Sequence, residues 1–390
     1  MKRFLVVLLV FPFVAMAVHG AEEAAATATA TPLFNGKDLS GWKSIGGGKW
    51  YVAEGCIVGE TGDGNYGWLV TEKEYSDFIL DLQFKPEAPG NAGIQFRSHV
   101  IDGEMYGYQA ECDPNIGMHT GGVYEEKGRG WLAQPTPEGE KALKPNEWNT
   151  YRIQMIGDHI QTFLNGQKIA DFHDGRTIRG IIALQVHSGN EPPVKMLWKD
   201  ITIQDLGYGP GWQPLFNGQN LDGWVEHGKE KWYVEDGMIV GKAVTNEYGY
   251  LSTQKTYKNF VLRLKFNAEG AGNSGLFYHS RLEDVKIYGV QAEIDPTPGK
   301  HSGGLYESYG RNWLILPNAE AEKLMRPIGQ WNEMQIWVKD NHVITHLNGW
   351  QAVDFVDDNP RDTDGVIALQ LHSGGQSAIR FEDIYIKEIQ

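Results

Sequence analysis

Two stretches of the sequence carry the same set of reactive side chains. Residues 106–125 read YGYQAECDPNIGMHTGGVYE and residues 288–307 read YGVQAEIDPTPGKHSGGLYE, at a constant spacing of 182 residues. Both contain a Gln-x-Glu-x-Asp pattern followed by a histidine, a tyrosine and another glutamate. Because carboxylates and imidazoles are common proton donors and acceptors in enzymes, both stretches are candidate catalytic sites.

The carboxylates of each stretch are spaced so that they could act on one bond. Glu111 and Asp113, like Glu293 and Asp295, are two residues apart, which on a strand separates their Cα atoms by roughly 6.6 Å. A general acid and base can flank a glycosidic bond at such a separation, although side-chain reach leaves retention and inversion open. Carboxylates beside a histidine would also bind a divalent cation. The sequence has no HExxH or EF-hand motif, so it requires no cofactor and leaves a divalent cation open.

Histidine, aromatic and charged residues follow each carboxylate pair. His119 and His301 come just after the Asp-Pro turn, and the next residues form a loop rich in groups that bind sugars. Aromatic faces stack on pyranose rings, while carboxylates and guanidinium groups hydrogen-bond to hydroxyls. The predicted sugar contacts in these loops are Tyr124, Glu125, Arg129 and Trp131, matched by Tyr306, Glu307, Arg311 and Trp313.

Strand alternation predicts which side chains share a face, because successive residues of a strand point to opposite sides of the sheet. In YGYQAECDP, Gln109, Glu111 and Asp113 share one face, and Ala110 and Cys112 point to the other. The second copy repeats this division, with the polar set Gln291, Glu293 and Asp295 and the apolar set Ala292 and Ile294. The apolar face predicts a core, and the polar face predicts an exposed or cleft-like surface.

Two further strands add polar groups to such a face. In LQVHSG and its repeat LQLHSG, a glutamine and a histidine alternate with apolar residues; they are Gln185 and His187, and Gln370 and His372. In GIQFRSH, Gln95 and Arg97 are expected to point away from the core, but the second copy has Phe277 and His279 at these positions. The copies therefore agree on the Gln-x-His face and differ at Arg97.

A polar sheet face has other interpretations besides a binding site. It is normally solvated, and buried carboxylates could also form a structural network that holds a loop. Between the copies, ordinary surface residues differ while the Gln-x-Glu-x-Asp and Gln-x-His faces are kept. This selective retention favours a site present in both copies, with the structural network as the alternative.

The chain is organised as two copies of one domain. PLFNGKDLSGW (32–42) matches PLFNGQNLDGW (214–224), and KWYVAEGCIVGE (49–60) matches KWYVEDGMIVGK (231–242). Alternating segments such as FILDLQF, hairpin patterns such as RIQMIGDHIQTFLNG and few helical stretches (PEGEKALK and NAEAEKLM) predict an all-β chain. We expect two tandem jelly-roll β-sandwiches over residues 32–206 and 214–390, joined by a linker over 207–213.

The N-terminus predicts export. Residues 1–20 read MKRFLVVLLVFPFVAMAVHG, with two basic residues before a short apolar run that ends in small residues, which is typical of a secretory signal peptide. A membrane helix is the rival, but the run is short for a span of about 20 residues. Residues 21–31 predict a low-complexity tether. We expect a periplasmic or extracellular protein without a membrane span once the signal is removed.

The net charge of the chain narrows the classes of molecule that it is expected to bind. The formal net charge is −15, and an acidic surface repels phosphate backbones, which argues against nucleic acid and anionic lipid. Carbohydrate is the expected partner, and the oligomeric state stays open.

The two cysteines, Cys56 and Cys112, align with Met238 and Ile294 in the second copy, so buried free thiols are favoured over a disulfide.

Taken together, the motifs resemble a known family. LFNGKDLSGW, the WYVxxGxIVG hairpin, the GNAG and GNSG turns, the G-Y/V-Q-A-E-x-D strand, the GG-V/L-YE loop and ALQxHSG are similar, in order and spacing, to the domain of unknown function 1080. This domain is also called the 3-keto-disaccharide hydrolase domain. The resemblance covers both copies, and implies a concanavalin/LamG-like jelly roll and cleavage of glycosides already oxidised at C3 of the sugar.

The resemblance also implies roles for residues. A C3 ketone acidifies the C2 proton, so a base can remove it and the C1 substituent can leave by elimination, with or without later addition of water. This implies His119 or His187 as base, Glu111 and Asp113 as acid or metal ligands, and Arg97 as stabiliser of the oxyanion. Gln109, Gln185 and Tyr124 would bind and orient the sugar. The candidates in the second copy are Glu293, Asp295, His301 and His372 for catalysis and Gln291, Gln370 and Tyr306 for binding. The family usually has Gln-Asp-His where this chain has Gln-Val-His and Gln-Leu-His.

Two other classes of function stay open. A jelly roll with a polar, aromatic groove also suits a tandem carbohydrate-binding protein without turnover, and a structural or cell-surface interaction module is a third reading. Retention of ionisable groups, rather than of aromatics and amides alone, favours catalysis.

Overall fold

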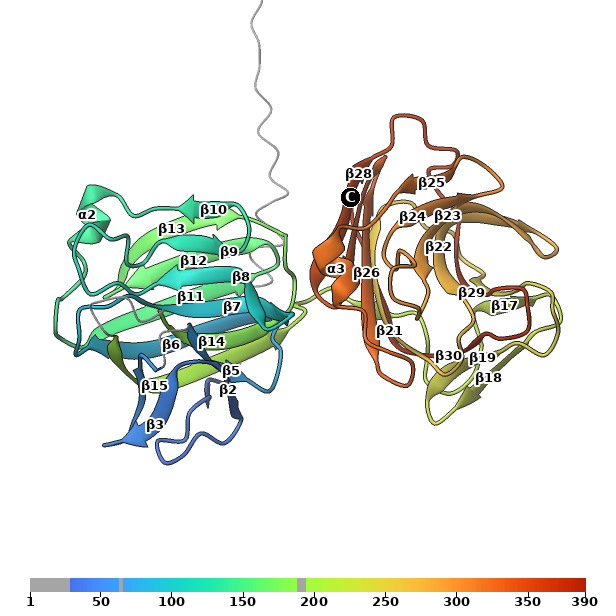
Figure 1. Cartoon of the computed structure of the whole chain (residues 1–390). Helices are drawn as coiled ribbons and strands as arrows, with labels where there is room; N and C mark the ends of the chain where they lie inside the picture. Colours follow the sequence, from blue (N-terminus) through green and yellow to red (C-terminus); the bar gives the residue numbers. More distant parts are fainter. Residues whose placement is uncertain (1–28, 63–65, 188–193) are drawn as a thin grey trace, which may run out of the picture. The chain divides into compact units, whose positions relative to one another are not determined.

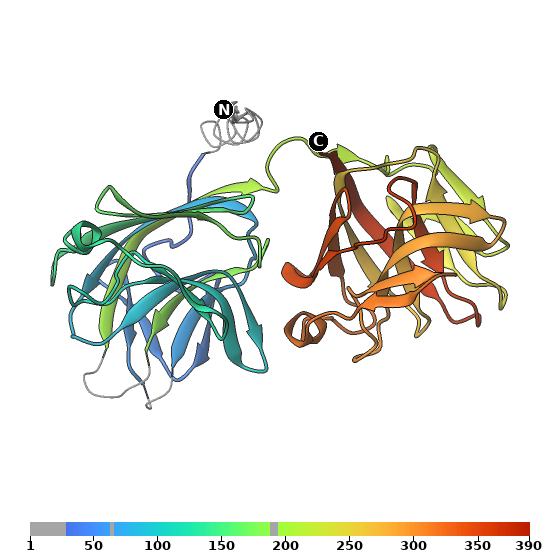
Figure 2. The same ribbon diagram turned by 90° about the horizontal axis from the view of Figure 1, so that it is seen from above.

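The computed structural model describes residues 29–62, 66–187 and 194–390. Apart from two short helices in these ranges, α2 (Pro137–Glu140) and α3 (Ala319–Lys323), the regular structure is all strand. The strands form four sheets, two for each copy, and the two sheets of a copy make up a sandwich (Figures 1 and 2). This confirms the predicted pair of jelly-roll β-sandwiches. The predicted signal peptide and most of the predicted tether lie outside the described residues.

The first sandwich consists of an eight-stranded and a seven-stranded sheet. The larger sheet has the strand order β13 (Gln167–His173), β12 (His159–Leu164), β11 (Asn149–Ile156), β6 (Asp77–Pro86), β15 (Lys195–Gly207), β4 (Cys56–Glu60) and β3 (Lys49–Ala53), with β1 (Thr31–Pro32) paired to β15. The smaller sheet has the order β10 (Gly130–Ala133), β9 (Val123–Glu126), β8 (Glu104–Glu111), β7 (Ala92–Ile101), β14 (Ile181–Val186), β5 (Gly67–Thr71) and β2 (Trp42–Gly46).

The second sandwich repeats this topology strand for strand. Its eight-stranded sheet has the order β28 (Trp350–Val356), β27 (His342–Leu347), β26 (Asn332–Lys339), β21 (Phe260–Ala268), β30 (Ala378–Glu388), β19 (Met238–Lys242) and β18 (Lys231–Glu235), with β16 (Gln213–Pro214) paired to β30. Its seven-stranded sheet has the order β25 (Asn312–Ile315), β24 (Leu305–Ser308), β23 (Lys286–Ile294), β22 (Ser274–Glu283), β29 (Val366–Leu371), β20 (Gly249–Thr253) and β17 (Trp224–His227).

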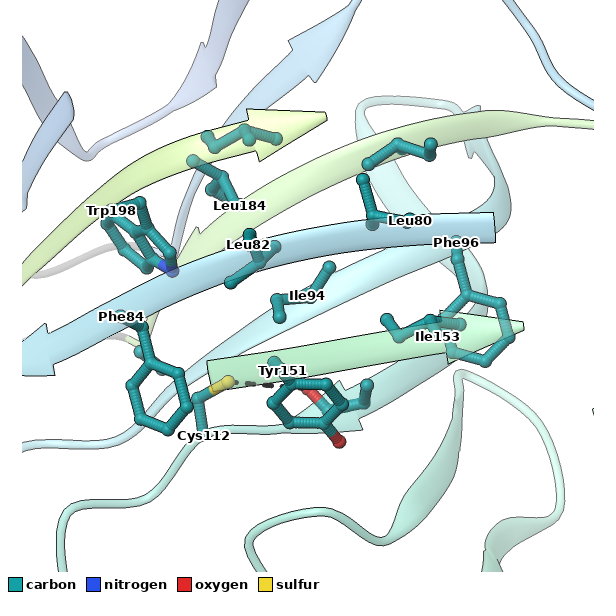
Figure 3. Packing of buried hydrophobic residues seen from close by; sticks show 14 of the residues in the cluster. Leu80, Leu82, Phe84, Ile94, Phe96, Cys112, Tyr151, Ile153, Leu184 and Trp198 are labelled. Carbon is teal, nitrogen blue, oxygen red and sulfur yellow. Dashed lines mark hydrogen bonds between the residues drawn. The ribbon is translucent and has the colours of Figure 1, made fainter. Parts of the chain in front are cut away.

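Each sandwich has its own hydrophobic core between its two sheets. Alternate residues of β21 are buried while those between them are half-buried, which is the pattern of a strand with one face in the core. The core of the first sandwich includes Leu80, Leu82 and Phe84 from β6, Ile94 and Phe96 from β7, and Trp198 from β15 (Figure 3). Each fully buried side chain of this kind contributes about 1.5–3 kcal/mol, so each sandwich holds itself together largely through its own core.

Two predictions about chemistry outside the site can be compared with this structure. Cys56 and Cys112 are both free and buried, as predicted. Burial raises the pKa of the Cys112 thiol well above its usual range, so this sulfur is a packing group rather than a nucleophile. Within the described ranges, no helix has the length and apolar character needed to cross a bilayer.

Separate cores give a matched pair of stability predictions. Leu80 and Leu262 occupy equivalent positions on β6 and β21 and are fully buried. Leu80→Ala and Leu262→Ala should each lower the free energy of unfolding by about 2–5 kcal/mol, because each leaves a cavity. Amide hydrogen exchange should accelerate mainly in the sandwich that carries the substitution. Equal acceleration in both sandwiches for either variant would contradict the separation of the cores.

Candidate functional site

A groove of about 690 Å³ lies on the seven-stranded sheet of the second sandwich, on the face opposite the core. This volume is in the range of sites that hold small molecules. The groove is lined by Tyr248, Tyr250, Asn273, Gln291, Glu293, Asp295, Gly299, Lys300, His301, Tyr306, Ser308, Tyr309, Asn312, Trp313, Gln370 and His372.

Strand register arranges these side chains in rows. Glu293 of β23 pairs with Gly275 of β22, and Gly275 pairs in turn with Gln370 of β29. Tyr250 of β20 continues this row. The adjacent row runs through Gln291, Tyr306 and Trp313 on β23, β24 and β25. The predicted division of the Gln-x-Glu-x-Asp strand into a core face and a polar face therefore agrees with the structure.

A glycine beside each glutamine makes room for it. A Cβ atom at Gly275 would lie 2.5 Å from Cδ of Gln291, and a Cβ atom at Gly93 would lie 2.7 Å from Cδ of Gln109. Carbon atoms cannot approach so closely. The glycines thus allow the glutamines to lie flat across the neighbouring strand and to reach the carboxyl group beyond.

An asparagine joins the two carboxyl groups of each copy. The amide nitrogen of Asn273 donates to Oε1 of Glu293, and lies 3.4 Å from Oδ2 of Asp295. Asn91 donates in the same way to Glu111, and to Oδ2 of Asp113 at 3.2 Å. Gln291 and Gln109 add donors to Oε2 of their glutamates at 2.7 and 3.2 Å. The hydrogen bonds to the two glutamates are therefore the same in both copies, whereas Gln109 also accepts from Gln95, which Phe277 replaces in the second copy.

These hydrogen bonds surround carboxyl groups that are almost completely buried. Glu111 and Glu293 are each 5% exposed. Burial and, to a smaller extent, the charge of Asp113 raise the pKa of Glu111, and the hydrogen bonds from Asn91 and Gln109 lower it, so that the net pKa is about 8. Burial and the charge of Asp295 likewise raise the pKa of Glu293 to about 7 against the hydrogen bonds from Asn273 and Gln291. At neutral pH both glutamates can therefore carry a proton and give it up.

A histidine and a tyrosine form a pair at the other end of each carboxyl network. Nε2 of His372 lies 3.2 Å from the hydroxyl of Tyr248, and Nε2 of His187 lies 2.8 Å from that of Tyr66. The backbone N–H of His372 donates to the carbonyl oxygen of Asn273 at 3.2 Å. Asn273 thus holds the imidazole through its backbone and the carboxyl group through its side chain.

His119 and His301 lie in the loops that the sequence predicted, and both have left-handed backbone conformations, with φ of 67° and 68°. Nδ1 of His119 is 3.0 Å from Oε1 of Glu140 on α2, and Nδ1 of His301 is 3.6 Å from Oε1 of Glu322 on α3. Few residues other than glycine adopt this conformation, although histidine does so more often than most. Its occurrence at the same position in both copies points to a retained function for these loops.

Trp131 and Trp313 form the wall next to these histidines. The ring of Trp131 meets those of His119 and Tyr124 edge to face, with centroids 4.9 and 5.4 Å away. Trp313 repeats these contacts with His301 and Tyr306. The histidine, tyrosine and tryptophan predicted from each loop are therefore brought together, and in the second sandwich all three line the groove.

The charged residues of the loops are placed differently from the prediction. Glu307 is buried and accepts a hydrogen bond of 2.6 Å from Nε of Arg311, whose Nη atoms donate to both oxygens of Asp357. Neither Glu307 nor Arg311 lines the groove. Glu125 and Arg129 form the equivalent network with Asp174. The sequence predicted sugar contacts here, whereas the structure has ion pairs that fix the hairpin carrying the tryptophan.

Arg97 is not brought to the carboxyl network. The strand bulges at this point, with φ of 44°, and Nη1 of the buried Arg97 donates to the carbonyl oxygen of Thr177 at 3.1 Å. The N–H of Cys112 donates to Ala92, so Glu111 lies near the start of β7, and Arg97 is roughly 13 Å further along the strand. Strict alternation along the strand predicts that Arg97 lies on the polar face, next to Gln95. The bulge, which His279 shares, interrupts that alternation.

Gln370 lies in the floor of the groove and is 3% exposed, and its counterpart Gln185 in the first copy is 1% exposed. The side-chain oxygen of each has no hydrogen-bond partner within the part of the chain that the structure describes. A buried acceptor without a donor is costly, and a sugar hydroxyl in the groove would supply the donor to Gln370.

Several residues of the site were not predicted, and the sequence carries a signal for four of them. Asn91 and Asn273 occur in GNAG and GNSG, and Tyr66 and Tyr248 each precede a glycine at the spacing of 182 residues. The comparison of the two copies that selected the carboxylates would have selected these residues as well. The groove residues Tyr250, Lys300, Ser308, Tyr309 and Asn312 differ from their counterparts in the first copy, so that comparison could not find them.

Across the described segments 29–62, 66–187 and 194–390, no group of three or more His, Cys, Asp and Glu side chains is arranged to hold a metal ion. The carboxyl oxygens of Glu111 and Glu293 accept hydrogen bonds from side-chain amides.

A β-sandwich with an aromatic groove around buried carboxyl groups is an arrangement typical of proteins that act on or bind carbohydrate. The chain belongs to the family of 3-keto-alpha-glucoside-1,2-lyase-like domains, whose model matches residues 29–204 and again residues 211–387.

Three other proteins are similar to parts of this chain. The 3-keto-disaccharide hydrolase of Bacteroides thetaiotaomicron is 24% identical over 169 residues, which make up 37% of this chain and 58% of that protein. A crystal structure of a predicted glycosyl hydrolase from Parabacteroides distasonis matches 46% of this chain and 94% of its own, at 25% identity and a TM-score of 0.37. The carbohydrate-binding module CBM66 from Bacillus subtilis matches 43% of this chain and 96% of its own, at 13% identity and a TM-score of 0.35.

The raised pKa of Glu293 gives a prediction for stability. In the unfolded chain this group ionises near its ordinary value of 4.5, whereas in the folded chain it ionises at about 7. Between these values the folded state binds more protons, so the free energy of unfolding falls as the pH rises. From pH 5 to pH 8, wild type should lose about 3 kcal/mol relative to Glu293→Gln, measured by denaturant unfolding.

A surface glutamate provides the control. Glu138 on α2 has a side chain that is 75% exposed, so Glu138→Gln should leave the pH dependence of wild type unchanged. Identical pH dependence for wild type and Glu293→Gln would mean that Glu293 is ionised throughout this range.

Proposed function

We propose that this protein cleaves glycosides whose sugar carries a ketone at C3, with one site in each sandwich. The observation that carries the proposal is the buried glutamate of each copy, Glu111 or Glu293, whose raised pKa lets it exchange a proton at neutral pH. Glu293 also lines a groove of suitable size. Membership of the family and the similarity to a 3-keto-disaccharide hydrolase support the same substrate class.

In the proposed reaction a base first removes the proton on C2, which the neighbouring ketone makes acidic. The imidazoles of His187 and His372 suit this task, because histidine is the usual base near neutral pH. Tyr66 and Tyr248 hold the imidazoles by hydrogen bonds. His119 and His301 remain the alternative bases, since they lie in the loops at the edge of the same site.

The electron pair left on C2 is shared with the C3 oxygen, and the bond from C1 to the leaving group then breaks. Glu111 or Glu293 in its protonated form would donate a proton to the departing oxygen. The amides of Asn91 and Gln109, or Asn273 and Gln291, are donors in the same network and suit the stabilisation of the C3 oxyanion. Later addition of water to the unsaturated sugar would give overall hydrolysis, and its omission would give a lyase.

Asp113 and Asp295 would assist as hydrogen-bond acceptors for the sugar, and Trp131 and Trp313 as platforms for its apolar face. Gln185 and Gln370 offer their unpartnered oxygens to a hydroxyl. The proposed reaction does not depend on a divalent cation. If a cation takes part, it would bind to the carboxylates, and the effect of a chelator on turnover tests this directly.

We also propose that the protein is exported. The support is the N-terminal pattern of Lys2 and Arg3 before a short apolar run, and fractionation of cells that express the full chain would test it.

Turnover tests the function. The full chain should release the leaving group from a 3-keto-glucoside with a chromogenic aglycone. The double variant with Glu111→Gln and Glu293→Gln should lose about 10²-fold or more of kcat/KM, because general acid catalysis contributes about that much. Glu138→Gln is the matched control and should retain wild-type turnover.

The assay is run with and without chelator. Release by wild type that disappears only with chelator would establish a cation, whereas no release under either condition would overturn the enzymatic proposal. Turnover of the double variant at the wild-type rate would remove the role of the glutamates.

The pH profile tests the protonated glutamate separately. Because Glu111 and Glu293 have pKa values of about 8 and about 7, the fraction that can donate a proton falls as the pH rises through this range. We expect kcat/KM to fall on the alkaline side between pH 7 and 9, measured in the free enzyme at low substrate concentration. A rate that stays level across this range would contradict the role of an acid with a raised pKa.

Binding without turnover is the second candidate. The exposed faces of Trp131 and Trp313, which are 37% and 39% exposed, suit a carbohydrate-binding module. This second function is supported if wild type binds the sugar but releases no aglycone, and if the double variant with Glu111→Gln and Glu293→Gln binds the sugar equally well.

A further inference from the structure

The residues at the rim of the second sandwich's groove differ from those at the equivalent positions of the first copy, although the carboxyl network of the floor is shared. In the second sandwich the rim includes Lys300, Ser308, Tyr309 and Asn312. At the spacing of 182 residues, the first sandwich has Met118, Glu126, Lys127 and Gly130. None of these four positions keeps its chemical character, whereas Trp131 and Trp313 beside them are identical.

The change affects side chains and leaves the backbone of the hairpin as it was. Tyr309 has φ of 52° and Lys127 has φ of 54°, while Asn312 and Gly130 have φ of 67° and 79°. Both copies thus make the same tight turn between the two hairpin strands. A bulky residue at positive φ is uncommon, so placing a tyrosine at this position accepts strain in order to present a particular side chain.

The turn in the second sandwich is also held in place. Arg361 donates from its two Nη atoms to the carbonyl oxygens of Ser308 and Tyr309, at 3.1 and 3.2 Å. The spacing between the copies grows from 183 at Asp174 and Asp357 to 185 at Gln185 and Gln370. The second copy therefore has two additional residues in the segment that carries Arg361.

The result is an exposed aromatic shelf at the end of the groove. Tyr309 is 54% exposed, and its ring centroid is 5.4 Å from that of Tyr288. The guanidinium group of Arg281 lies over the other ring, 4.3 Å from the centroid of Tyr288. The hydroxyl of Tyr306 donates to Oδ1 of Asn312 at 3.0 Å. The shelf thus combines an aromatic face with polar groups at its edge, which suits the apolar face and hydroxyls of a sugar ring.

We propose that Tyr309 and Asn312 form an additional sugar subsite in the second sandwich, next to the unit bound at Glu293. The groove of the second sandwich then takes an oligosaccharide, whereas the carboxyl site of the first sandwich, with charged Glu126 and Lys127 in the same turn, takes a shorter glycoside. This inference rests on the proposed function for the position of the first sugar, and it adds the substrate length that distinguishes the two copies.

Binding measurements on the full chain test the subsite without turnover. The probes are unoxidised glucose oligosaccharides of one to four units, in one α-linked and one β-linked series, titrated calorimetrically. For wild type, we expect affinity to rise about tenfold between one and three units in at least one series. Tyr309→Lys, which installs the residue of the first copy, should reduce that gain by about 3- to 10-fold, because the aromatic stack is lost.

Two further variants separate stacking from other effects. Tyr309→Phe should keep the gain in affinity with chain length, because the ring is retained. Tyr233→Lys makes the matched change at an exposed tyrosine of β18, outside the groove, and should also keep it. A wild type whose affinity does not rise with chain length in either series would overturn the proposal. So would a gain that Tyr309→Lys leaves intact.

The outcomes for the subsite and for the proposed reaction can be told apart. The double variant with Glu111→Gln and Glu293→Gln should keep the gain with chain length, because the shelf does not contain these residues. Failure of turnover with the gain retained would leave the subsite as part of a binding protein. Turnover without any gain would remove the subsite and leave the reaction.

Discussion

A carboxyl group that leaves water must find hydrogen-bond donors inside the protein, and the candidate site is arranged around this requirement. Glu111 and Glu293 are buried on a face that in most sheets would be solvated. Their donors come from the asparagine at the start of β7 or β22 and from the glutamine two residues earlier on their own strand. The glutamine reaches the carboxyl group only because Gly93 or Gly275 leaves space for it. The backbone of the same asparagine holds the histidine. Burial of one group therefore accounts for the glycine, both amides and the position of the imidazole.

The requirement also explains why these residues are retained as a set. Replacement of the asparagine would leave a buried carboxyl group short of a donor, and replacement of the glycine would push the glutamine aside. Each change costs stability whether or not a substrate is present, so retention alone does not distinguish a site from a structural network. What distinguishes them is access. In the second sandwich Asn273, Gln291, Glu293 and Asp295 all line an open groove, whereas Glu307 and Arg311, which are retained equally well, do not. The sequence comparison gives both sets equal weight, and the structure separates them.

Some features of the fold and of the site can be predicted from the sequence, and others cannot. The fold and the division of the Gln-x-Glu-x-Asp strand follow from a period of two residues, which depends only on local geometry. Arg97 departed from expectation because a bulge breaks that period, and a positive φ at an arginine leaves no mark on the hydrophobic pattern. Arg129 departed because its partner Asp174 lies 45 residues further along the chain, and a long-range ion pair cannot be read from a local motif. The buried thiols could be predicted, since the second copy has Met238 and Ile294 at the equivalent positions.

Duplication leaves the two copies free to differ where the fold does not constrain them. Each sandwich has its own core and its own carboxyl network, so each floor is held by contacts within its own sandwich. The turn between the hairpin strands keeps its backbone conformation with either Lys127 or Tyr309, and neither side chain is buried in a core. Substitution at this position therefore alters what the groove contacts without altering what holds the sheet together. A residue of the floor has no such freedom, because the buried carboxyl group depends on it. Divergence between the copies is expected to accumulate at the rim, and the differences between Lys127 and Tyr309 and between Gly130 and Asn312 follow this rule.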